Sequence, residues 1–226
     1  MCNIAGYAGN RPAAPILIDM LLREEGFDSG YYSGIATICD GKIYHTKLIG
    51  DMKTLLENTD AATLPGNVGF IHGRSGPVSG DGRWAHPFTT NKNGTDKIAY
   101  IANGSIGFAA NRRKEYGELA DRLLSDGYDL PSRQVFSGDV YNKLSDGTTA
   151  HMSDVMCQLI ARHMDLGKDA QYALEDAFCE MPSEIVGLLL ALDSPDKIFF
   201  SRINQPMFAS FRPRRISCNN GDCVPR

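Results

Sequence analysis

The sequence has no apolar stretch that approaches the roughly 20 residues needed to span a membrane. Its longest apolar run, residues 185–192, is interrupted by Gly187 and has only the length of a strand. The N-terminus also lacks the basic segment followed by an apolar segment that marks a secretory signal peptide. The net charge is −4, and three arginines near the C-terminus form the only basic cluster. We therefore expect a cytoplasmic protein that binds neither membranes nor nucleic acid.

Cysteine patterns that would indicate a disulfide framework or a metal centre are also scarce. Three of the six cysteines, Cys39, Cys157 and Cys179, fall in apolar or periodic segments, which predicts buried thiols of a cytosolic protein. Cys218 and Cys223 flank a short polar segment, where a disulfide or half of a metal site is possible. Neither has a second ligand pair nearby, so we favour an unstructured tail with thiols and expect no metal or cofactor.

The sequence does contain enough apolar residues for a substantial core. Hydrophobic residues make up 42% of the 226 residues, which suits one large domain or two small ones. Residues 34–39 and 42–48 are strand-like runs separated by Asp40-Gly41, a strong hairpin signal. Residues 112–125 carry one apolar stripe at helical spacing. Further strands are predicted at residues 4–8, 67–72, 98–102, 185–192 and 197–203, and further helices at residues 14–25, 51–58, 153–164 (capped by Ser153) and 169–179.

This order of elements indicates antiparallel sheets with helices packed on them. Strands come early, helices lie in the middle and strands return late, with no internal repeats. We therefore expect an α+β fold with one domain over residues 1–210 and a polar tail over residues 211–226.

The second residue, Cys2, stands behind an initiator methionine, which aminopeptidases can remove when the next residue is small. Removal of Met1 would leave Cys2 with a free α-amino group beside its own thiol. A thiol is a weak nucleophile until a nearby base or a lowered pKa makes the thiolate available. An α-amine titrates at about 7.7–8.0, so one residue can supply both nucleophile and base. Many chains begin Met-Cys, so the assignment of Cys2 as a catalytic nucleophile depends on the rest of the sequence.

Polar residues with complementary chemistry follow at the ends of predicted elements. Arg74 is the second residue of a glycine-rich loop over residues 73–82, and Asn103-Gly104 follows another strand. An asparagine side-chain amide and a glycine backbone N–H can bind a developing oxyanion. Arg74 can grip a carboxylate bidentately, and Asp154, at the start of a helix, can take an ammonium group. Together these groups suit attack by a thiol on an amide of an amino acid.

Several short motifs, in this order, resemble the class II glutamine amidotransferases. The resemblance spans residues 2 to about 207 and is closest to the glutaminase domain of glucosamine-6-phosphate synthase. The motifs are Cys2 with Ile4 and Gly6-Tyr7, Gly26-Phe27-Asp28-Ser29, Gly34-Ile35-Ala36, His72-Gly73-Arg74, Ala85-His86-Pro87-Phe88 and Asn103-Gly104.

The resemblance implies a four-layer αββα sandwich of two antiparallel sheets, the N-terminal-nucleophile hydrolase fold. It also implies hydrolysis of L-glutamine to L-glutamate and ammonia through a γ-glutamyl thioester. The implied roles are Cys2 as nucleophile with its amine as base, Asn103 and Gly104 as the oxyanion hole, Arg74 on the α-carboxylate, Asp154 on the α-amino group, and Ser75 and His86 beside the bound glutamine.

The sequence departs from the synthase pattern at several positions. Asn3 replaces a glycine, Ala102 replaces a histidine, and residues 75–78 replace Trp-Ala-Thr-His. No sugar-phosphate domain follows, so the ammonia acceptor is expected on another chain, a separate synthase subunit, and a homo-oligomer is possible. The alternatives are an N-terminal-cysteine hydrolase acting on another amide and a non-catalytic relative that binds glutamine or a partner.

Overall fold

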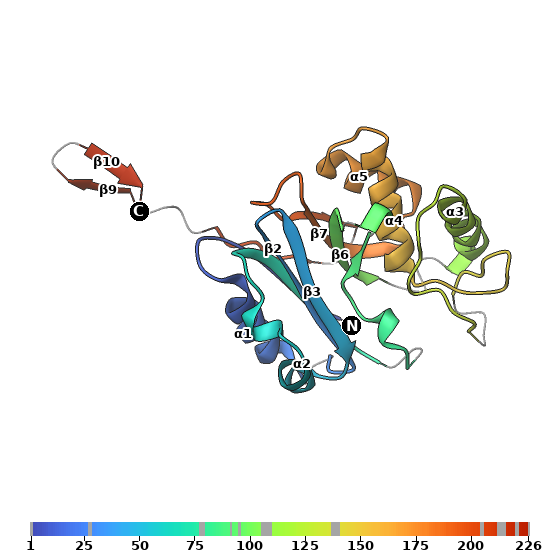
Figure 1. Ribbon diagram of the computed structural model, residues 1–226, viewed down its shortest axis with the longest axis horizontal. Helices are drawn as coiled ribbons and strands as arrows, with labels where there is room; N and C mark the ends of the chain where they lie inside the picture. The colour runs from blue at the N-terminus through green and yellow to red at the C-terminus, as the bar shows by residue number, and fades with distance from the viewer. Residues whose placement is uncertain are drawn as a thin grey trace.

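The computed structural model describes residues 2–26, 29–76, 80–90, 92–94, 96–104, 110–136, 141–203, 206–211, 216–219 and 222–225. Two four-stranded antiparallel sheets are stacked face to face, and helices cover the outer face of each (Figure 1). The predicted α+β class and the four-layer αββα sandwich are therefore confirmed.

The first sheet has the strand order β1-β4-β2-β3. Its hairpin turn is built by Asp40 and Gly41, whose φ angles are 47° and 69°, as a tight turn between twisted strands requires. The helices α1 and α2 lie on the outer face of this sheet (Figure 1). The elements are β1 (Asn3–Ala8), α1 (Ala13–Glu24), β2 (Tyr32–Cys39), β3 (Lys42–Ile49), α2 (Met52–Asn58), the 3-10 helix η1 (Ala61–Thr63) and β4 (Val68–Arg74).

The second sheet has the order β5-β6-β7-β8; helices α4 and α5 pack on its outer face, and α3 packs beside α4 (Figure 1). Its elements are η2 (Gly82–Trp84), β5 (Phe88–Thr89), η3 (Lys92–Gly94), β6 (Ile98–Gly104), η4 (Ala110–Arg112), α3 (Arg113–Ser125), α4 (Met152–Asp165), α5 (Ala170–Glu180), β7 (Glu184–Ala191) and β8 (Phe199–Arg202).

Strand alternation divides the buried residues of the sandwich among three layers. In β4, Ile71 faces α1, whereas Val68 and Phe70 face the second sheet. They meet inward-facing residues of β6 such as Ala99 and Ile101. The interface between the sheets is therefore apolar along most of its length.

Several expectations from the sequence are wrong. Strand β4 continues through Arg74, so the first two residues assigned to the glycine-rich loop lie in the sheet. Helix α4 begins at Met152 because the imidazole of His151, not Ser153, caps it by accepting a hydrogen bond from the Ser153 backbone N–H at 3.1 Å. Cys179 is exposed rather than buried, whereas Cys157 is buried as predicted and Cys39 is partly exposed.

The tail expected to be unstructured contains a hairpin. Strands β9 (Ile216–Asn219) and β10 (Asp222–Pro225) form a separate two-stranded antiparallel sheet, drawn apart from the sandwich in Figure 1. Cys218 and Cys223 are directly opposite each other in its ladder. Over the described part of the chain, no helix is both long enough and apolar enough to cross a membrane.

Candidate functional site

The inward face of β4 changes from apolar to polar at one end of the sandwich. Successive inward positions are Val68, Phe70, His72 and Arg74, and all four side chains are buried. The interface between the sheets therefore ends in an imidazole followed by a guanidinium.

The register of the first sheet brings Cys2 to the same end. Strand β1 pairs with β4 so that Ile4 lies opposite His72 and Asn3 opposite Gly73. Cys2 comes one residue before this ladder, and alternation puts it on the same face as Ile4, next to Arg74. Cys2 is partly exposed, as its predicted role as a nucleophile requires.

A hydrogen bond between the sheets brings the predicted oxyanion residues to this end. His72 Nε2 lies 3.0 Å from the carbonyl oxygen of Ala102 in β6, and because a carbonyl only accepts, Nε2 carries the proton. Asn103 and Gly104 follow directly, and the β6–β7 register shifts between them. Such irregularities re-aim side chains next to active sites. Asn103 is partly exposed and Gly104 exposed.

Arg74 is held rigidly by aromatic neighbours. Its side chain is 7% exposed, and Nη1 donates to the Trp84 carbonyl oxygen at 3.1 Å. The guanidinium carbon lies 5.2 Å from the centre of the Tyr32 ring and 6.0 Å from that of the Trp84 ring. These contacts fix the cation in a largely desolvated environment, where its interaction with an anion is stronger than in water.

His86 lies inside the sandwich, behind His72. The two rings stack with centroids 4.0 Å apart, and the His151 ring lies 5.2 Å from that of His86 on another side. The strand position facing this segment is Gly34, where an added Cβ would lie 2.0 Å from the His86 carbonyl oxygen. Only glycine permits this approach. Burial lowers the pKa of His86 well below its usual value, so the ring is neutral.

Lys47 ties the segment that carries His86 to the first sheet. Its Nζ donates to the carbonyl oxygens of Ala85 at 2.8 Å and Pro87 at 2.9 Å, and lies 4.6 Å from the centre of the Phe88 ring. Burial lowers the pKa of Lys47 to about 8.

Asp154 is fully buried, with its carboxylate already bound inside the protein. One oxygen accepts from the backbone N–H of Ser132 at 2.9 Å and from its hydroxyl at 2.6 Å, and the other accepts from Gln158 at 3.1 Å. Burial raises the pKa of Asp154, partly offset by these hydrogen bonds. Its role as a ligand for a substrate ammonium group stays a prediction, and this network would have to open for that contact.

Sequence reasoning missed two residues that organise this region. The indole Nε1 of Trp84 donates to the Ser132 carbonyl oxygen at 2.8 Å, which connects the support of Arg74 to the Asp154 network. Trp84 is the only tryptophan in the chain, and that rarity was the one available signal. Nothing in the sequence around Ser132 distinguishes it from other loop serines.

Ser75 follows Arg74 and is partly exposed. Some residues named in the sequence analysis lie outside the described part of the chain: Met1, Phe27, Asp28, Pro77 and Val78.

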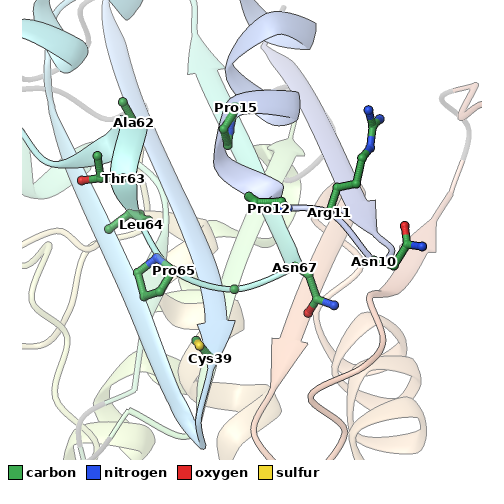
Figure 2. Close-up of a pocket in the computed structure, with 11 residues that line it drawn as sticks. Asn10, Arg11, Pro12, Pro15, Cys39, Ala62, Thr63, Leu64, Pro65 and Asn67 are labelled. Carbon is green, nitrogen blue, oxygen red and sulfur yellow. The ribbon is translucent and has the colours of Figure 1, made fainter.

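A surface pocket of about 540 Å³ lies at the opposite end of the first sheet (Figure 2). Cys39, at the end of β2, faces it together with Arg11 and Asn67, beside Pro12 and Pro65. Partial burial and the neighbouring Asp40 carboxylate raise the pKa of the Cys39 thiol. This pocket is separate from the convergence of Cys2, Arg74 and Asn103.

Comparison with solved structures identifies the fold as that of the N-terminal-nucleophile amidotransferases. Glutamine phosphoribosylpyrophosphate amidotransferase from B. subtilis superposes with a TM-score of 0.56 at 17% identity, over 85% of this chain and 35% of that one.

Sequence comparison gives the narrower relationship. Two glutamine--fructose-6-phosphate aminotransferases are similar to the chain: that of Clostridium acetobutylicum is 34% identical over 203 residues, and that of Pyrococcus horikoshii 28% identical over 211. The matches cover 86% and 92% of this chain but 29% and 30% of the relatives. No protein-family profile matches. These similarities support a class II glutamine amidotransferase domain, as the motifs predict, and the chain spans about three tenths of the length of these curated relatives.

Proposed function

We propose that the chain hydrolyses L-glutamine to L-glutamate and ammonia, with Cys2 as the nucleophile. The observation that carries this proposal is the meeting of three strand ends around the bond from His72 to the Ala102 carbonyl. The donor, His72, lies two residues before Arg74, and the acceptor, Ala102, directly precedes Asn103. The pairing of β1 with β4 brings Cys2 to the same end of the sheet. The names of the relatives support glutamine as the nitrogen donor.

The reaction begins once Met1 has been removed. The α-amine of Cys2 takes the thiol proton, and the thiolate attacks the side-chain amide carbon of glutamine. Asn103 and the Gly104 N–H stabilise the oxyanion of the tetrahedral intermediate. The carbon–nitrogen bond then breaks, the α-ammonium returns its proton to the leaving ammonia, and a γ-glutamyl thioester remains. Water, activated by the same amine, attacks the thioester and releases glutamate and the free thiol.

Arg74 holds the α-carboxylate of the substrate. A guanidinium carries five N–H donors, and Nη1 donates to the Trp84 carbonyl, so the group retains donors for a carboxylate that enters beside Cys2. Ser75 borders the same entrance. His86 does not touch the substrate in this proposal and stabilises the site through its stacking on the His72 ring. Ammonia passes to an acceptor on another chain or on a further part of the same protein.

A second candidate is an N-terminal-cysteine amidohydrolase that acts on a different amide. The burial and internal hydrogen bonds of the Asp154 carboxylate favour it, because they keep this anion away from the ammonium group of an entering amino acid. In that reaction Cys2, Asn103 and Gly104 keep their roles and Arg74 binds another acidic group.

Glutamate release from glutamine, measured beside a set of simple acyl amides, separates the two candidates. The first predicts turnover of glutamine alone, and faster turnover of an acyl amide would favour the second. Intact-mass measurement of the active protein tests the mechanism, because full activity with Met1 retained would exclude the α-amine as the base.

A further inference from the structure

We infer that His72 is a positioning residue: its Nε2–H, donated across the two sheets to the Ala102 carbonyl, holds Asn103 and Gly104 in place relative to Cys2. The inference rests on the proposed function and adds to it a residue that touches neither substrate nor reacting atoms. The 3.0 Å bond is made by a fully buried side chain that belongs to the nucleophile's sheet and reaches the oxyanion strand.

Stability alone gives little reason for a histidine at this position. One inward step earlier, Phe70 packs between the sheets against apolar residues of β6. A buried hydrogen bond contributes only modestly to stability, and replacing both partners by apolar groups of the same shape can be nearly neutral. His72 instead places a polar ring at a position that is 0% exposed. What a histidine offers here that a phenylalanine would not is a directional hydrogen bond.

The ring of His72 is locked in one orientation and one tautomer. His86 stacks on it at 4.0 Å with an interplanar angle of 28°. The carbonyl acceptor requires the proton on Nε2, and Nδ1 has no hydrogen-bond partner among the described residues. Burial lowers the pKa of His72 to about 3, so the ring stays neutral throughout the physiological range. Protonation of the ring therefore does not switch this bond within that range.

The bond acts on the oxyanion residues through a rigid unit. The Ala102 carbonyl and the Asn103 N–H belong to one planar peptide group, so fixing the carbonyl direction fixes the plane that leads into Asn103. The β6–β7 register shifts immediately afterwards, between Asn103 and Gly104. At its other end, His72 is paired with Ile4, two residues from Cys2.

Loss of the bond is expected to affect turnover rather than substrate binding. Small displacements of catalytic groups, about 1 Å, can reduce rates about 10²-fold. Arg74 keeps its own hydrogen bond to Trp84, so its grip on the substrate is independent of His72. His72→Leu should therefore lower kcat about 10- to 100-fold and change KM less than about threefold.

His72→Gln provides the conservative rescue, because the glutamine amide N–H occupies nearly the place of Nε2–H and can donate to the same carbonyl. Its kcat should stay within about threefold of the unmodified chain. Phe70→Leu, one inward position away in the same buried layer, is the matched control: it should destabilise the fold and leave kcat unchanged. If His72→Leu does not fold, His72→Asn replaces it, since its amide is too short to reach Ala102.

Two readouts separate this inference from the proposed function. Nitrogen NMR of the His72 ring should show the Nε2–H tautomer, and amide hydrogen exchange at Asn103 and Gly104 should accelerate in His72→Leu but not in His72→Gln or Phe70→Leu. Full kcat in His72→Leu, or equal losses in the leucine and glutamine variants, would overturn the positioning role. If the unmodified chain does not hydrolyse glutamine, the proposed function fails, and the tautomer and exchange results still decide whether the bond orders the β6 end.

Discussion

The two ends of the first sheet carry the same residue types with different consequences. At one end stand Cys2 and Arg74, with Asn103 approaching from the second sheet; at the other, Cys39, Arg11 and Asn67 surround an open pocket (Figure 2). Each end of the sheet therefore carries a cysteine, an arginine and an asparagine.

The ends differ in how firmly these groups are held. Arg74 is 7% exposed and bound to the Trp84 carbonyl, whereas Arg11 is exposed. The Asn67 amide donates to the Gly9 carbonyl at 2.7 Å and so serves a loop, while the partly exposed Asn103 follows a carbonyl fixed by His72. Catalysis depends on preorganised groups aimed at one point. Burial and fixed geometry, rather than residue type, therefore make the Cys2 end the better candidate for an active site than the Cys39 end.

The largest expected difference between the ends concerns the two cysteines. Cys2→Ala should abolish glutamine hydrolysis, and Cys2→Ser should be nearly as damaging because a hydroxyl is a far poorer nucleophile here. Cys39→Ala should leave turnover unchanged, since the raised pKa of Cys39 keeps its thiol protonated. Peptide mapping after treatment with a glutamine-analogue diazoketone should find the label on Cys2, and a label on Cys39 instead would refute the assignment.

The sequence supported more of the fold than of the site. The Asp40-Gly41 hairpin follows from local turn chemistry, and α3 from a single apolar stripe, so both could be predicted from short segments. The start of α4 was missed because an imidazole, rather than a hydroxyl, caps it. The tail hairpin has no strong alternation of its own in the sequence.

The motifs identified the candidate residues but not their environments. Arg74 is buried by Tyr32 and Trp84, and Asp154 is satisfied by Ser132; these contacts join segments of the chain with no local signal in common. Periodicity indicates which face a residue occupies, whereas its partners depend on how remote loops pack over it. The roles of the site residues therefore remain predictions to be tested by substitution.

The asparagines should show the next largest contrast. Asn103→Ala should lower kcat about 10²-fold or more with little change in KM, because an oxyanion donor acts mainly in the transition state. Asn67→Ala is the matched control and should affect only the ordering of the loop at Gly9. Steady-state glutaminase kinetics of both variants give the comparison, and a raised KM with unchanged kcat in Asn103→Ala would contradict the oxyanion role.

The arginines should differ in substrate affinity. Arg74→Ala should raise KM about 10- to 100-fold, the equivalent of one or two charge-assisted hydrogen bonds, and affect kcat less because this contact is made before and during the reaction. Arg11→Ala should change neither parameter. Equal changes in kcat and KM for Arg74→Ala and Asn103→Ala would show that the proposed division between binding and catalysis is wrong.

Lys47, which contacts the segment that carries His86, should give the smallest effect, visible in stability rather than turnover. Its folded-state pKa of about 8 lies below the usual lysine value of 10.5, so between these values the unfolded chain binds a proton that the folded chain has released. The free energy of unfolding contributed by Lys47 should therefore rise with pH, by about 1–2 kcal/mol between pH 8 and 9.5. Lys47→Met keeps the apolar stem and removes the titrating group.

Urea denaturation of the unmodified chain and of Lys47→Met over this pH range isolates the contribution. Other groups titrate in the same window, notably Cys157, whose buried thiol has a raised pKa and favours unfolding as pH rises. Because Cys157 is present in both proteins, it cancels in the difference between them to first order. The free energy of unfolding of the unmodified chain minus that of Lys47→Met should rise steadily with pH. A constant difference would show that Lys47 is hydrated in solution and does not bind the carbonyl groups of Ala85 and Pro87 as a desolvated cation.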